Sequence, residues 1–294
     1  MSVPVIANSV FARDTELSTL GSGSYRAELN RNWWVIAGPN GGLLAALLLR
    51  AVEAEVGRRD VGQGRSVRTM TVHYLAPSGE GDAELEVEVD KHGRSVSFAT
   101  VTLSQQGRLI AKALVLLAAE RPAVREWQQR HLPSVLDLGD SFLAVDGLDE
   151  VPLRERWDQR WAIGVPGFPD TNPEGLLQVG GWTRLADPHP YDGAVLAAMT
   201  DSWVPAVIVH EDARLTSPTL ELTIHFRTDP ARLGLGPEDH VLAVFRQETG
   251  SEGYLDESGE LWSADGRLLV VCRQLGAVLE RPDEAEPKEF LFSR

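Results

Sequence analysis

Residues 192–207, DGAVLAAMTDSWVPAV, decide the fold of this chain. Asp192-Gly193 is a helix-start signal, because an aspartate side chain can accept hydrogen bonds from the free N–H groups of a first helical turn. Good helix formers and apolar residues follow, and Pro205 closes the run because proline fits poorly inside a helix. The segment is apolar on nearly every side, which predicts a buried helix.

Asp201 is the exception within this apolar segment. A buried carboxylate is unfavourable unless it is paired, hydrogen-bonded or protonated. An aspartate near a helix end can also point into water, which is the usual state of such a side chain. The segment alone therefore leaves two interpretations of Asp201, a buried functional acid and a solvated helix end.

A second apolar helix is predicted in residues 43–56, directly after Asn40-Gly41-Gly42. The glycines indicate a close approach of the backbone at the helix start. The free N–H groups and partial positive charge there suit a carbonyl oxygen or a phosphate. Because Gly-Gly at a helix start is often only a packing feature, the motif alone does not identify a ligand.

Strand signals follow both predicted helices, and short anchors align the two halves of the chain. Such self-similarity predicts one structural unit used twice, as residues 1–122 and 151–294, joined by a linker at 123–150 with a short helix near 124–130. The matched anchors are Ala45-Ala46 with Ala197-Ala198, Thr71-Val72-His73-Tyr74 with Thr223-Ile224-His225-Phe226, and Gly107-Arg108-Leu109-Ile110 with Gly266-Arg267-Leu268-Leu269.

The informative positions are those at which the two halves disagree. Three apolar residues of the first copy become polar in the second: Leu49 becomes Asp201, Val67 becomes Thr219, and Val115 becomes Gln274. Polar groups destabilise a core unless they satisfy one another, so their joint appearance predicts one hydrogen-bonded cluster. The alternative is a chance set of exposed polar residues.

Composition narrows the classes of function. With 294 residues and 43% hydrophobic residues, the chain can build a packed core, and no apolar run is long enough to span a membrane. The net charge of −15 argues against nucleic acid as a partner. The first residues lack the pattern of a signal peptide, and Cys272 has no second cysteine to pair with, so we expect a cytoplasmic protein without a disulfide.

Asp, Thr and Gln together have the parts needed to hold and activate a water molecule. The carboxylate accepts the proton as a general base, while the hydroxyl and the amide orient the water. The sequence contains neither a nucleophile-elbow motif nor the paired spacing of metal ligands, so we expect no metal.

With these features, the chain resembles the double hot-dog acyl-CoA thioesterases of the thioesterase II type, over roughly residues 25–120 and 175–280. The order and spacing of several motifs carry the resemblance. These are Asn40-Gly41-Gly42, Val72-His73-Tyr74-Leu75-Ala76-Pro77, His92-Gly93-Arg94-Ser95-Val96-Ser97, Gly181-Trp182-Thr183-Arg184-Leu185, Thr200-Asp201, Thr219 to Phe226, and Arg273-Gln274-Leu275-Gly276.

The resemblance implies an α+β fold of two tandem hot-dog units, each an antiparallel sheet wrapped around a long central helix. It implies hydrolysis of an acyl-CoA thioester to a free acid and CoA, with Asp201, Thr219 and Gln274 holding the water. Backbone N–H groups of Gly41 or Gly42 would stabilise the oxyanion. No cofactor is expected beyond the CoA of the substrate, and we expect a homo-oligomer.

Two alternatives stay open, because fold does not fix function. One is an acyl-CoA-binding protein of the same fold without catalysis. The other is a hot-dog hydratase, for which Asp187-Pro188-His189 would be the candidate site, although this stretch is turn-like and precedes the helix. In addition, strand alternation places Thr219 on the face opposite Leu220, Leu222 and Ile224. A β-bulge, or a site between the two units, is therefore required.

Overall fold

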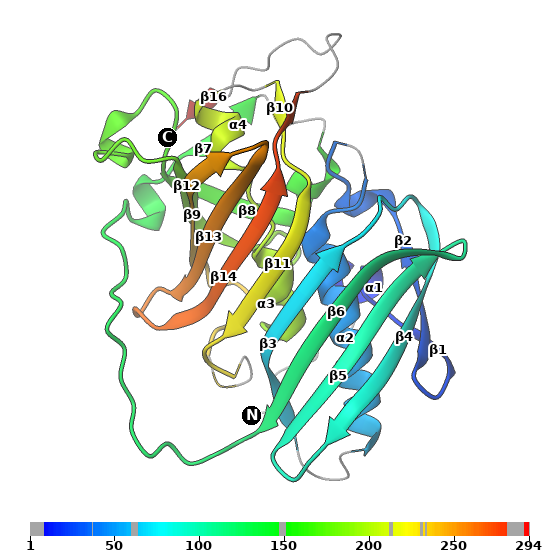
Figure 1. The fold of residues 1–294 in the computed structure, drawn as a ribbon. Coiled ribbons are helices and arrows are strands. Elements are labelled where there is room, and N and C mark those ends of the chain that lie inside the picture. Colours follow the sequence, from blue (N-terminus) through cyan, green and yellow to red (C-terminus); the bar gives the residue numbers. More distant parts are fainter. Residues whose placement is uncertain are drawn as a thin grey trace.

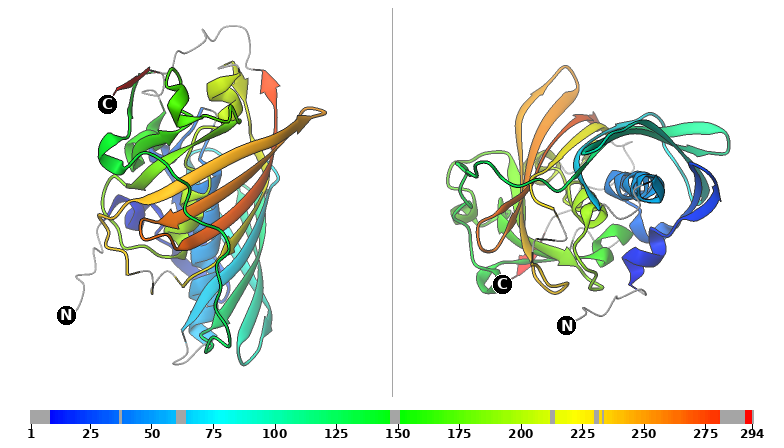
Figure 2. Two further views of the ribbon diagram at one scale, coloured as in Figure 1. Left: turned by 90° about the vertical axis from the view of Figure 1, so that its left-hand side faces the viewer. Right: turned by 90° about the horizontal axis from the view of Figure 1, so that it is seen from below.

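Both predicted apolar helices form in the computed structural model, which describes residues 9–36, 38–59, 64–146, 151–211, 214–229, 232, 234–280 and 291–293. The first is α2 (Gly41–Arg59) and the second is α3 (Gly193–Met199). Both pack against one face of a twelve-stranded antiparallel sheet (Figure 1). Seen along the sheet, the strands of each half curve around the helix of that half (Figure 2). The expected architecture of two similar units is confirmed.

The sheet is continuous through both halves of the chain. In spatial order it contains β1 (Ser18–Gly21), β2 (Ser24–Leu29), β4 (Gly81–His92), β5 (Val96–Gln105), β6 (Arg108–Ala119), β3 (Arg65–Tyr74), β11 (Thr219–Phe226), β14 (Leu268–Ala277), β13 (Tyr254–Ser263), β12 (Val241–Ser251), β9 (Gln178–Leu185) and β8 (Trp157–Ile163). The order of strands away from the central β3–β11 pair is therefore the same in the two directions, as an internal repeat requires.

Shorter elements lie around the sheet. The helices are α1 (Val10–Asp14) and α4 (Ala206–His210), with 3-10 turns at Arg31–Trp33, Leu138–Asp140, Pro152–Arg156 and Pro169–Thr171. Two strand pairs complete the described elements, β10 (Leu215–Thr216) with β15 (Leu279–Glu280) and β7 (Leu143–Asp146) with β16 (Leu291–Ser293).

A local two-fold axis passes through the β3–β11 pairing. Thr71 lies directly opposite Thr223, their hydroxyl oxygens are 3.0 Å apart, and 152 residues separate them in sequence. The flanking pairs are Val72–Leu222, Met70–Ile224, His73–Glu221 and Thr69–His225. Each pair maps onto another when the halves exchange, so the predicted equivalence of Thr71 and Thr223 is confirmed.

The two helices begin in the same way but differ in length. The side chains of Asn40 and Asp192 each accept a hydrogen bond from the backbone N–H three residues later, at 3.2 Å and 2.8 Å. Whereas α2 continues for 19 residues, α3 has only 7 and stops at Met199. The prediction of one helix from Asp192 up to Pro205 is therefore wrong. Pro205 instead starts the separate helix α4, because proline is well tolerated at a helix N-terminus.

The segment after β6 runs as extended chain along the outside of the molecule to the second half (Figure 1). The helix predicted near residues 124–130 is wrong, since residues 120–137 contain no regular element. Trp127 there is 80% exposed, so this stretch has no buried apolar face to stabilise a short helix. The unit boundaries at residues 122 and 151 stay predictions, and the tail after Glu280 lies largely outside the described residues.

The helices α2 and α3 meet at close range where the first turn of α2 contacts the end of α3. A Cβ atom on Gly42 would lie 2.5 Å from the backbone carbonyl oxygen of Ala198, closer than any carbon can approach. Twelve residues of α2 are buried and all seven of α3 are buried, so neither helix can easily move aside. Glycine at position 42 is therefore a packing requirement of this junction.

Gly42→Ala should lower the free energy of unfolding by roughly 1–3 kcal/mol, because the added methyl group overpacks a rigid junction. The matched control is Gly57→Ala in the same helix, where a Cβ would meet nothing within 4 Å. That change should raise stability by about 0.5–1 kcal/mol, since alanine is the better helix former. Urea denaturation of both variants measures the difference, and similar effects from the two changes would contradict the proposed close contact.

Candidate functional site

Asp201 lies at this junction, one residue beyond the C-cap of α3. Its Oδ2 accepts hydrogen bonds from Asn40 Nδ2 at 2.8 Å and from the backbone N–H of Gly42 at 3.0 Å. Asn40 Nδ2 also donates to the backbone carbonyl of Asp201 at 2.7 Å. The positive end of α2 thus faces the carboxylate and stabilises its charge. Asp201 is bound by the other unit of the fold and is not a solvated helix end.

Thr219 reaches the inner side of the sheet through a β-bulge. The register between β11 and β14 shifts between Thr219 and Glu221, and this irregularity reverses the side of the strand on which Thr219 lies. Its hydroxyl donates to Gln274 Oε1 at 2.9 Å. The first half has a matching register shift between Val67 and Thr69 on β3, so the bulge belongs to the repeated unit.

Two further polar side chains, Glu257 and Gln247, extend this contact, and neither was predicted from the sequence. Gln247 Nε2 donates to Glu257 Oε2 at 2.9 Å, and Gln274 Nε2 donates to Glu257 Oε1. The run of acidic residues around Glu257 is typical of a solvated strand face. The signal that could have found it is alternation, because Glu257 has the same parity as the buried residues Leu255 and Leu261.

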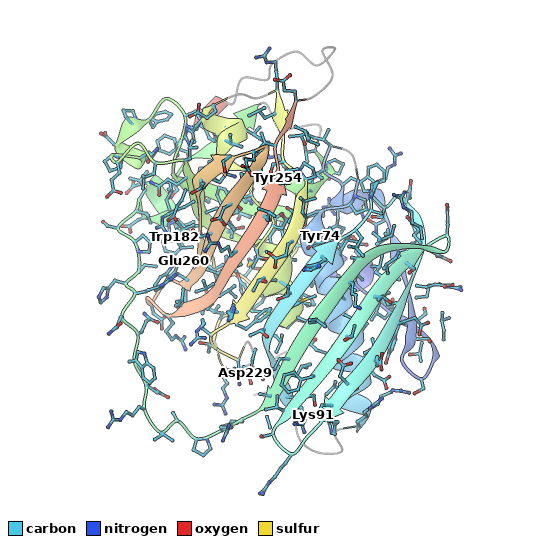
Figure 3. All side chains as sticks on the ribbon, in the orientation of Figure 1. Tyr74, Lys91, Trp182, Asp229, Tyr254 and Glu260 are labelled. Atoms are coloured by element: carbon cyan, nitrogen blue, oxygen red, sulfur yellow. The ribbon has the colours of Figure 1, made fainter. Side chains whose placement is uncertain are left out.

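A cavity of about 610 Å³ connects these groups, and Asp201, Thr219, Gln274 and Glu257 all line it. Tyr74 also lines it, at the end of β3 beside the seam between the two halves of the sheet (Figure 3). Most of the remaining wall is apolar and includes Ile36, Leu44, Leu75, Trp161, Trp203 and Ile208. The structure thus brings the three predicted site residues around one apolar space, although none of the described hydrogen bonds joins Asp201 directly to Thr219 or Gln274.

Burial shifts the proton affinity of both carboxylates in this cavity. It raises the pKa of Asp201 to about 6, and the hydrogen bonds from Gly42, Gly41 and Asn40 limit the rise. Burial also raises the pKa of Glu257 to about 7, with the nearby charge of Asp201 adding to the rise. Both acids therefore change charge close to neutral pH, which is typical of groups that transfer or direct protons.

Gly41 and Gly42 stand next to Asp201, as the adjacent Asn40 does. The N–H of Gly42 donates to Asp201 Oδ2, and Gly41 contributes a backbone hydrogen bond to the same carboxylate. An N–H group that binds the base is not at the same time available to a developing oxyanion. The oxyanion role of the two glycines therefore stays a prediction, whereas their contact with the carboxylate is observed.

The corresponding place in the first half is apolar. Leu49, Val67 and Val115 are 0%, 1% and 3% exposed, and they occupy the positions that Asp201, Thr219 and Gln274 hold in the second half. The start of α3 faces this cluster, since a Cβ on Gly193 would contact side chains of Val67 and Leu49, and the carboxylate of Glu53 lies beside them. The repeat therefore generates two equivalent places, and the polar set occupies one of them.

The stretch Asp187-Pro188-His189 has a structural role near the start of the described chain. His189 Nδ1 lies 2.7 Å from the Ser9 hydroxyl, and Asp187 Oδ2 accepts from the N–H of Val10 at 2.6 Å. In the described ranges, no cluster of His, Cys, Asp and Glu side chains could hold a metal ion. Within the same ranges no helix combines the length and the apolar character needed to cross a bilayer.

Comparison with known proteins relates both halves of the chain to one family. Residues 30–118 match the acyl-CoA thioesterase N-terminal domain, and residues 130–278 match the acyl-CoA thioesterase C-terminal domain. The thioesterase-like protein TwmA of Talaromyces wortmannii is 28% identical over 230 residues, which cover 67% of this chain and 63% of that protein.

Solved structures with the same fold extend the comparison. A hot-dog-fold protein of Alicyclobacillus acidocaldarius is 26% identical with a TM-score of 0.79, covering 94% of this chain and 100% of that chain. The acyl-CoA thioesterase II TesB2 of Mycobacterium marinum has a TM-score of 0.72 at 18% identity, covering 94% of this chain and 100% of that chain.

Asp201→Asn should stabilise the protein at alkaline pH. The pKa of Asp201 is about 6 in the folded state, above the ordinary value of 3.8, so the charged carboxylate destabilises the folded protein. This destabilisation is complete above pH 6 and absent below about pH 4. Allowing for partial exposure, the substitution should raise the free energy of unfolding by about 1–2 kcal/mol at pH 8 and by much less at pH 4.5. Urea denaturation at the two pH values tests this, and an effect independent of pH would contradict it.

Proposed function

The chain belongs to the acyl-CoA thioesterase family of double hot-dog proteins, and on that premise we propose that it hydrolyses an acyl-CoA thioester with Asp201 as the general base. The observation that supports this most is the position of the Asp201 carboxylate at the N-terminus of α2, in one apolar cavity with Thr219 and Gln274. A carboxylate with a pKa of about 6 is largely ionised at pH 7 and still basic enough to take a proton.

We propose a reaction that uses this geometry. The hydrogen bonds from Asn40 Nδ2 and from the Gly42 N–H fall on Oδ2. In the proposed reaction Oδ1 takes a proton from a water held by Thr219 and Gln274. The water oxygen attacks the thioester carbonyl carbon, the carbon–sulfur bond breaks, and Asp201 returns the proton to the departing sulfur. The products are the free acid and CoA, and the carboxylate is restored.

The cavity supports an acyl group as the part of the substrate that is buried. Its apolar walls include Leu75 and the paired indoles of Trp161 and Trp203, whose ring centroids are 4.8 Å apart. Apolar surface of this kind favours a hydrocarbon chain over a charged group, because a charge would lose its hydration there. The thioester would then lie next to Asp201, where the cavity wall becomes polar.

Asp201→Asn should lower kcat for the best acyl-CoA by about 10²–10⁴-fold, because it keeps the shape of the side chain and removes the base. The measurement is release of the CoA thiol from a panel of acyl-CoAs of different chain length. Full turnover by this variant with clean substrate would show that Asp201 is not the base.

Leu49→Asn is the matched control at the equivalent place of the first half. It buries an amide among apolar side chains, and it should lower the free energy of unfolding by roughly 1–3 kcal/mol while the remaining folded protein keeps its turnover. A wild-type protein that binds acyl-CoA but releases no thiol from any member of the panel would favour the binding function without catalysis.

A further inference from the structure

A chain of four side chains leads from the backbone of α4 into the cavity. The N–H of Val207 donates to Gln247 Oε1 at 2.7 Å, and Gln247 Nε2 donates to Glu257 Oε2 at 2.9 Å. On the other side of the carboxylate, Gln274 Nε2 donates to Glu257 Oε1, and the Thr219 hydroxyl donates to Gln274 Oε1 at 2.9 Å. Gln247, Glu257 and Gln274 are 7%, 4% and 9% exposed, so water competes little for these contacts.

The backbone fixes the direction of the hydrogen bonds at one end of this chain. A backbone N–H can only donate, so the oxygen of the Gln247 amide must face Val207 and its nitrogen must face Glu257. An ionised carboxylate can only accept, so Glu257 accepts from Gln247 and from Gln274. The carboxylate is thus the point at which the direction of donation reverses.

This reversal determines what Thr219 presents to the cavity. Because the nitrogen of the Gln274 amide faces Glu257, its oxygen faces Thr219 and accepts the only hydroxyl proton that Thr219 has. Thr219 is left with lone pairs, and Gln274 with the second hydrogen of its amide nitrogen. A water beside them can donate to Thr219 and to Asp201, accept from Gln274, and keep one lone pair for attack.

We propose that Glu257 is a positioning residue that sets the direction of the hydrogen bonds holding the hydrolytic water. The proposal rests on the hydrolysis proposed above and adds a residue to it. Glu257 acts through Gln274 and Thr219 and does not itself take the proton of the water. A neutral side chain of the same shape at position 257 accepts from Gln247 and donates to Gln274. The Gln274 amide then turns over, Thr219 becomes a donor toward the water, and the attacking lone pair is occupied.

Protonation of Glu257 has the same consequence as such a substitution, because the neutral acid donates with one oxygen and accepts with the other. Its pKa of about 7 places this change near neutrality. The charged group that faces it is Asp201, from the turn after α3. On β14, burial raises the pKa of the Cys272 thiol and keeps it neutral. The neighbouring β12 and α4 contribute the neutral groups of Gln247 and Val207.

The test compares Glu257→Gln with the wild type from pH 5.5 to pH 8.5. At pH 8 the variant should fold normally by thermal melting, keep its KM, and lose kcat by roughly 10- to 100-fold, a loss typical of a misplaced reactant. The ratio of the two kcat values should fall toward 1 below pH 6, because the wild-type glutamate is then protonated. Loss of a merely structural contact would not produce this convergence.

Thr219→Val supplies the second measurement. In the wild-type background it should lower kcat, whereas in the Glu257→Gln background it should add little, because Thr219 no longer accepts from the water. Glu260→Gln is the matched control, since Glu260 lies on the same strand and pairs with Arg130 and Arg246 outside the cavity (Figure 3). It should leave kcat and its pH dependence unchanged.

The outcomes separate the two proposals. If the wild type releases thiol and Glu257→Gln matches it at pH 8, or loses the same factor at every pH, the positioning role is overturned while the hydrolysis proposal stands. Additive effects of Glu257→Gln and Thr219→Val also overturn it. If the wild type releases no thiol from any acyl-CoA, the proposed function fails, and the positioning role fails with it.

Discussion

The antiparallel pairing of β3 with β11 is the constraint on which the rest of the structure depends. Because Thr71 faces Thr223 on a local two-fold axis, each helix is placed with its start against the other unit. The start of α2 thereby meets the end of α3, and Asp201 receives hydrogen bonds from residues that lie about half the chain away in sequence. Neither unit alone contains both the carboxylate and the helix terminus that binds it.

The residues that cap α2 and α3 differ, and each has a different partner in the other unit. At the polar place the capping residue is Asn40, whose amide donates to Asp201 while its oxygen caps α2. An aspartate there would set a second negative charge against the carboxylate. At the apolar place the capping residue is Asp192, which pairs with Arg50 at 3.0 Å. Glu53 lies near Asp192, and burial together with the charge of Asp192 raises its pKa to about 7. The same backbone position is thus an amide beside Asp201 and an acid paired with Arg50.

Much of the fold and of the candidate site was predictable from the sequence, because both depend on the repeat. Comparison of the matched anchors isolated Asp201, Thr219 and Gln274, and strand alternation showed that Thr219 needed a bulge, which the register contains. The end of α3 was not predictable, because good helix formers continue to Met199 and no strong stop follows before Pro205. Glu257 was missed because its partners come from two neighbouring strands, and only the register reveals them.

The extended segment that joins the two halves has a consequence for how such a site can evolve. In a symmetric dimer of identical chains, every substitution appears twice. A substitution that replaces the acid by an apolar residue at one of the two equivalent places would therefore remove the acid from the other place as well. One continuous chain releases the two places from this coupling. Leu49 can then be selected for stability independently of Asp201, so a single molecule holds one polar place, where we propose the reaction, and one apolar counterpart of it.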